Sequence, residues 1–183
     1  MHAILNFRIY VIVIVVFVCS ERCLAQDPAL PVPTGNVNQL FYLQRTPDDN
    51  TVVYQLNYKD GILNNEEPVN AYWIRYAEQG QQISLTTLQW HFAYGLKAKK
   101  GTGDSYSLAF LADRDRTMTL RRNAAGRYGV YITLNQKDVL LKKIYLKING
   151  GSFWSPNIEY AEFTGSDAET GAVVSERFSV SSK

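Results

Sequence analysis

From residue 36 to the end of the chain, apolar and polar side chains alternate with a period of two along short segments, which turn residues interrupt. Within Thr51 to Lys59, for example, Val52 and Tyr54 fall on one face and Gln55 and Asn57 on the other. This alternation is typical of strands with one buried face. It predicts about nine strands, at 40–45, 51–59, 69–77, 106–111, 117–122, 128–134, 139–148, 158–163 and 173–180.

So many short strands joined by turns predict an all-β domain, either an antiparallel barrel or a two-sheet sandwich. We favour the barrel, because closure removes the exposed edges of a sheet. The segment 69–77 carries apolar residues on both faces, which predicts a central strand. One short helix is expected over 85–94, with Ser84 as its N-cap residue and Gly95 just past its end.

The first 25 residues differ from the rest, since Ile9 to Val18 is an unbroken apolar run that follows a short region with one basic residue. This order predicts a secretory signal peptide over residues 1–25. The run is about half as long as a membrane-spanning helix requires, so we expect no transmembrane anchor in the mature chain. Residues 26–35 are rich in proline and predict an extended leader, and 36–183 are expected to form a single all-β domain.

The mature protein is therefore expected to begin at Gln26 and to act in the periplasm or outside the cell. The competing interpretation is a lipoprotein acylated at Cys19, which the bulky Val18 before it disfavours. Both cysteines, Cys19 and Cys23, precede Gln26, so the mature chain would contain no cysteine, and therefore no disulfide or thiol nucleophile. The intact mass of the exported protein checks this prediction, and a mass that includes an acylated Cys19 would contradict it.

The composition, with 46% hydrophobic and 20% charged residues, indicates a folded globular domain rather than a disordered chain. Charge is unevenly distributed, since residues 97–147 hold 12 basic and 4 acidic side chains. Such a region attracts anionic partners, here a small molecule, an acidic glycan or an envelope component. The candidate residues for this patch are Lys99, Lys100, Arg121 and Lys143. The alternative is that the basic residues pair with the acidic flanks, and no motif of a nucleic-acid-binding module is present.

Catalytic chemistry has few candidate residues in this chain. His91 is the only histidine after the predicted signal peptide, and a Gly-x-Ser-x-Gly nucleophile motif is absent. We therefore expect no catalytic residues, no metal site and no cofactor, and favour a non-catalytic domain that binds a ligand or a partner. The alternatives are a hydrolase or transferase that uses His91 with a carboxylate, and a structural or assembly component of the envelope.

Four sequence blocks together resemble a known family: LFYLQR at 40–45, VNAYWIRY at 69–76, FAYG at 92–95 and GGSFW at 150–154. They are similar to an exported bacterial family catalogued as domain of unknown function 4833, over essentially the whole mature chain. The resemblance implies a single exported domain and supplies no activity. Aromatic, arginine and histidine residues in and beside these blocks are the candidates for a ligand site, namely Trp73, Arg75, Trp90, His91, Tyr94 and Trp154.

Overall fold

The computed structural model describes residues 30–152 and 156–179 of the chain, so the predicted signal peptide lies outside the described residues. The strands are β1 (Gln39–Arg45), β2 (Thr51–Leu56), β3 (Tyr58–Lys59), β4 (Ile62–Leu63), β5 (Val69–Arg75), β6 (Gln81–Ser84), β7 (Leu96–Lys100), β8 (Tyr106–Phe110), β9 (Thr117–Arg122), β10 (Tyr128–Leu134), β11 (Lys137–Gly151), β12 (Pro156–Asp167) and β13 (Val173–Ser179). The helical segments are the 3-10 turn η1 (Tyr76–Glu78), the single turn α1 (Thr87–Gln89) and the π-helical turn η2 (Trp90–Tyr94). None of the described helices is long and apolar enough to cross a membrane.

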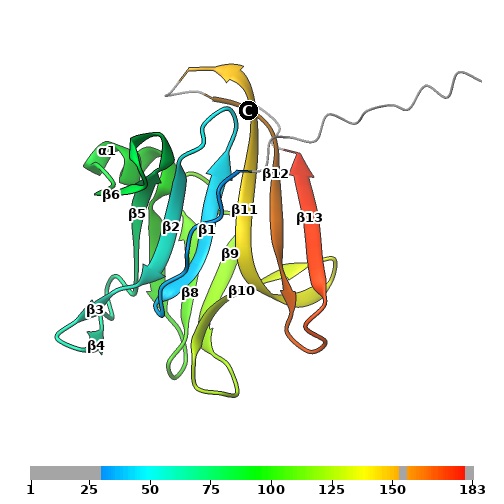
Figure 1. Ribbon diagram of the computed structural model, residues 1–183. Coiled ribbons are helices and arrows are strands. Elements are labelled where there is room, and N and C mark those ends of the chain that lie inside the picture. Colours follow the sequence, from blue (N-terminus) through cyan, green and yellow to red (C-terminus); the bar gives the residue numbers. More distant parts are fainter. Residues whose placement is uncertain (1–29, 153–155, 180–183) are drawn as a thin grey trace, which may run out of the picture.

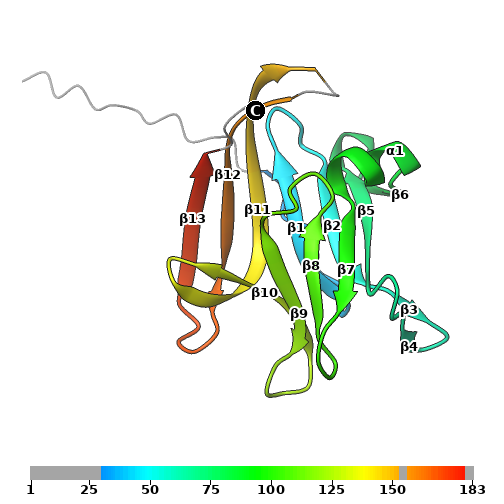
Figure 2. The same ribbon diagram turned by 180° about the vertical axis from the view of Figure 1, so that it is seen from behind.

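Eleven of the strands form one continuous sheet, in the order β6-β5-β2-β1-β11-β10-β9-β8-β7, and β12 and β13 are added along the other edge of β11. The sheet curls so that β1, β2 and β5 lie opposite β7 and β8 (Figures 1 and 2). We call the inside of this curl the concave face and the outside the convex face. The all-β prediction is confirmed, but the fold is an open half-barrel rather than a closed barrel or a clear two-sheet sandwich.

The half-barrel stays open because the strands at the two ends of the order, β6 and β7, do not pair with each other in the described part of the chain. The chain passes from one to the other through α1 and η2, which lie at one end of the curl (Figure 2). The short helical connection thus takes the place of the hydrogen bonds that would close a barrel.

The core lies on the concave face, where it joins the two sides of the curl. Phe41 on β1 stacks on Tyr54 on β2 with ring centroids 4.4 Å apart. Phe110 on β8 meets both rings edge-on, at 6.5 Å from Phe41 and 5.8 Å from Tyr54. Val52 and Leu56 are buried in the same core, as the alternation along β2 predicts.

The described part of the predicted leader, residues 30–35, packs on the convex face. The side chain of Gln44, only 1% exposed, donates a hydrogen bond of 2.7 Å to the carbonyl of Pro31. Pro33 is buried, and just past the leader Asn36 donates a hydrogen bond of 3.4 Å to the hydroxyl of Tyr72. β5 pairs with β2 on one side and with β6 on the other, so it is an inner strand, as its two apolar faces predict, although only β6 separates it from the end of the sheet.

A β-bulge between Leu141 and Lys143 changes which side chains of β11 reach the concave face. Leu141 before the bulge and Ile144 after it are both buried in the core, although they are three residues apart. The bulge therefore lets both halves of this 15-residue strand turn apolar side chains inward. A regular alternation would place Leu140 on the same face as Ile144. Because of the bulge, Leu140 lies on the convex face together with Lys143.

The helix predicted over 85–94 is shorter and begins later than expected. Its N-cap residue is Thr86 rather than Ser84, since Thr86 and Gln89 form a reciprocal capping box with hydrogen bonds of 2.9 Å and 3.3 Å. One turn later the chain widens into η2, which Gly95 ends by donating its N–H to the carbonyl of Trp90 at 2.8 Å. The prediction that Gly95 follows the last helical residue is confirmed.

Candidate ligand-binding cleft

A cleft of about 910 Å³ lies on the concave face beside the core. One of its walls comes from β11 and β12, which bring apolar side chains side by side in register. The three pairs are Ile144 with Phe163, Leu146 with Ala161, and Ile148 with Ile158. Because β1 ends beside Leu146 while β11 and β12 continue, this wall extends beyond the rest of the sheet (Figure 1).

The facing part of the cleft comes from α1, η2 and the β8–β9 loop, residues 111–116. Leu88 and Phe92 line it with 52% and 67% of their surface exposed, whereas Leu43 and Phe110 line it from the buried core. Exposed large apolar side chains beside a concave apolar wall are typical of ligand sites.

Tyr94 connects the cleft to the core. The residue lines the cleft and is 4% exposed, and its backbone carbonyl accepts a hydrogen bond of 2.9 Å from the buried hydroxyl of Tyr54. Burial raises the pKa of the Tyr94 hydroxyl, while the nearby Arg45 lowers it and Asp48 raises it. The phenol is therefore protonated at neutral pH and can donate a hydrogen bond.

Arg45 borders the cleft on the β1 side. Its guanidinium carbon lies 5.6 Å from the ring centroid of Trp73 and 5.8 Å from that of Tyr94, and one terminal nitrogen bonds to Asp48 at 3.1 Å. Among the described residues, the buried Nε of Arg45 has no hydrogen-bond acceptor. The indole Nε1 of Trp73 is buried and lacks an acceptor in the same way.

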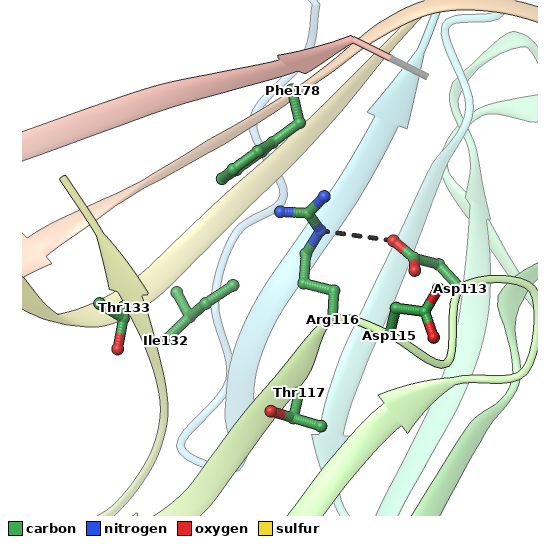
Figure 3. Close-up of a pocket in the computed structure, with 7 residues that line it drawn as sticks. All are labelled: Asp113, Asp115, Arg116, Thr117, Ile132, Thr133 and Phe178. Atoms are coloured by element: carbon green, nitrogen blue, oxygen red, sulfur yellow. Dashed lines mark hydrogen bonds and ion pairs between the residues drawn. The ribbon is translucent and has the colours of Figure 1, made fainter. Parts of the chain in front are cut away.

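Arg116 borders the cleft on the β12 side. Its Nε donates to Asp113 at 3.3 Å, and its guanidinium carbon lies 3.6 Å from the ring of Phe178 and 5.1 Å from that of Phe163. A second cavity of about 350 Å³ adjoins this side, and Figure 3 shows Arg116 between Phe178 and Asp113 there. The two cavities share Asp113, Asp115 and Arg116, so the Arg116 side chain lies where they meet.

Of the aromatic residues selected from the sequence, Tyr94 alone lines the cleft among those described. Trp73 lies behind Tyr94 in the core, with the two rings edge-on and their centroids 5.1 Å apart. Trp90 is partly buried and packs against the same core. These two tryptophans therefore support the cleft instead of lining it.

Two further candidates that the structure describes, Arg75 and His91, are not among the residues that line the cleft. Arg75 is paired with Glu78 at 2.7 Å on the surface, and Trp154 lies outside the described residues. His91 is exposed, and in the part of the chain that the structure describes it makes no hydrogen bond to a carboxylate. The hypothesis of an enzyme that uses His91 thus stays a prediction without a described partner group.

The basic candidates lie apart from one another. Lys99 and Lys100 belong to β7, where alternation turns Lys99 to the convex face and Lys100 to the concave face. The ammonium group of Lys100 bonds there to the hydroxyl of Tyr106 at 3.0 Å. Arg121 and Lys143 are on β9 and β11, two and four strands away from β7 in the sheet.

Arg121 is further occupied by local contacts on the convex face, since it pairs with Asp138 and lies over the ring of Tyr131 at 3.7 Å. Other basic residues of 97–147 pair within that region too, as Arg122 does with Asp104 at 3.3 Å. The four candidates therefore form no single cluster, and their binding to an anionic partner stays a prediction.

One family model matches the chain, and it is described as Domain of unknown function (DUF4833). The match covers residues 41–177, from β1 to β13, and so includes the whole curled sheet and both walls of the cleft. No curated protein and no solved structure matches the chain.

Proposed function

Because this chain belongs to the DUF4833 family, whose description carries no activity, we propose a function from its own geometry: it is a non-catalytic domain that binds an apolar or amphipathic small molecule in the concave cleft. The observation that carries the proposal is the continuous apolar wall of β11 and β12 beside a cleft of about 910 Å³. Small-molecule sites typically occupy about 300–1,000 Å³ and combine apolar walls with a few polar groups. Arg45 and Arg116 are such groups here.

We also propose that the protein acts outside the cytoplasm. This part of the proposal rests on the apolar segment before Gln26 alone, and the intact mass of the exported protein tests it.

The binding proposal is tested by filling the cleft. Ala161 faces the cleft beside Leu146, so Ala161→Trp places an indole against the apolar wall. The neutral fluorophore N-phenyl-1-naphthylamine should bind the wild-type protein saturably with a rise in emission. The variant should bind it at least about tenfold more weakly, because the indole occupies the same space.

Ala109→Trp is the matched control, because Ala109 lies on β8 between the inward residues Leu108 and Phe110 and faces the convex side. This variant should bind the fluorophore like wild type, provided that circular dichroism shows both variants folded. If wild type fails to bind, or if Ala161→Trp binds equally well, the cleft is not the site and the proposal is wrong.

A further inference from the structure

The polar end of the ligand can be inferred from Arg45, and this inference rests on the proposed function. Arg45 is the last residue of β1 and pairs in parallel register with Leu146, so its guanidinium borders the apolar wall directly. The other arginines of the cleft, Arg114 and Arg116, come from the β8–β9 loop instead.

The guanidinium of Arg45 has donor capacity that its described neighbours leave unused. One of its terminal nitrogens bonds to Asp48, whereas the buried Nε has no acceptor in the described part of the chain. The other terminal nitrogen has no acceptor among the described residues either, and the side chain keeps 23% of its surface exposed, so this nitrogen can donate to an acceptor that a ligand supplies.

Tyr94 adds a second donor at the same place. Tyr94 lines the cleft, its ring centroid lies 5.8 Å from the Arg45 guanidinium carbon, and its hydroxyl, whose pKa burial raises, is protonated at neutral pH. Hydrogen bonds from a charged donor to an anionic oxygen are stronger than neutral ones, and a site shielded from water strengthens them further. An anionic oxygen between Arg45 and Tyr94 would satisfy both groups.

We propose that the ligand is an amphiphile of the fatty-acid class, with its carboxylate at Arg45 and its hydrocarbon chain along the β11–β12 wall. A carboxylate fits better than a phosphate dianion because Asp48 already holds a negative charge 3.1 Å from the same guanidinium. Asp48 repels every negative charge at this position, so it opposes a phosphate dianion about twice as strongly as a carboxylate monoanion.

The test is displacement of N-phenyl-1-naphthylamine by dodecanoate, dodecan-1-ol and dodecyl phosphate, each below the concentration at which it forms micelles. On wild type, dodecanoate should displace the fluorophore at a concentration at least about tenfold lower than dodecan-1-ol does. Arg45→Met should remove most of this difference between dodecanoate and dodecan-1-ol. Arg75→Met is the control, because the Arg75 side chain pairs with Glu78 on the surface. This variant should leave the difference between dodecanoate and dodecan-1-ol unchanged.

Asp48→Asn keeps an oxygen that can accept the 2.8 Å hydrogen bond from the N–H of Asn50, but removes the competing charge. It should bind dodecanoate more tightly than wild type does. Because unfolding would weaken binding, a rise in affinity cannot be explained by loss of structure. The inference is overturned by equal binding of dodecanoate and dodecan-1-ol, by tighter binding of dodecyl phosphate, by unchanged or weaker dodecanoate binding in Asp48→Asn, or by loss in Arg116→Met instead of Arg45→Met. Each of these leaves the proposed function standing, whereas failure of the fluorophore to bind wild type removes both.

Discussion

Replacing Tyr54 with alanine should lower the free energy of unfolding by about 3–5 kcal/mol, the range observed for large aromatic residues in well-packed cores. Tyr54 is fully buried, stacks on Phe41 and meets Phe110 edge-on. Its removal would leave a cavity between the two sides of the curled sheet. Urea denaturation followed by circular dichroism measures the loss, and a change below about 1 kcal/mol would contradict the role assigned to this cluster.

Tyr54→Phe separates the contribution of the hydroxyl from that of the ring. The variant keeps the ring contacts but leaves the Tyr94 carbonyl without its 2.9 Å hydrogen bond, which costs about 1–3 kcal/mol for a buried acceptor. Since that carbonyl belongs to η2, which lines the cleft, we expect weaker binding of the fluorophore as well. Full stability in Tyr54→Phe would show that this hydrogen bond does not hold η2 in place.

Gly95→Ala should lower the free energy of unfolding by about 3 kcal/mol and disturb the cleft. A Cβ atom at this position would lie 2.2 Å from the carbonyl oxygen of Trp90 and 2.9 Å from the side chain of Leu111. The Leu111 side chain can turn away, but the Trp90 carbonyl accepts the Gly95 N–H at 2.8 Å and cannot move without opening η2. Thermal unfolding and fluorophore binding should therefore both be affected.

Gly35→Ala is the matched control for this substitution. Gly35 lies in the leader, where a Cβ atom would come no closer than 3.7 Å to the Gln39 side chain. The variant should unfold at the same temperature as wild type. Equal melting temperatures for Gly95→Ala and Gly35→Ala would show that η2 adapts to a side chain at this turn.

Strand alternation predicts much of this fold because one face of each strand is buried against the core. The strands 117–122 and 128–134 are found with the predicted bounds, as β9 and β10. Three strands, β4, β6 and β7, were missed for the opposite reason, and β4 has only two residues. Three of the five residues of β7 are lysines, and β6 is short and mostly exposed, so neither carries a buried stripe that a pattern can reveal.

The cleft was not predicted, since it depends on how the sheet curls. Arg45 and Arg116 were not among the candidates, because nothing in the sequence shows that the end of β1 and the β8–β9 loop approach the same wall. One signal was present, namely the apolar series Ile144, Leu146 and Ile148. This series continues along β11 beyond the point where its partner strand β1 ends. Apolar side chains there have no β1 neighbour beside them, which is typical of a cavity wall rather than of a core strand.

The parallel pairing of β1 with β11 has a consequence for the order in which the protein assembles. Tyr42 pairs with Lys143, so the two strands meet only after about a hundred intervening residues have been synthesised. Contacts so distant in sequence form slowly, because closing a long loop costs entropy before any contact compensates for it. During biosynthesis β1 and β2 can pair early, but the other edge of β1 stays uncovered until β11 emerges. The apolar wall also needs β12, which follows β11, so the cleft is completed among the last events of folding.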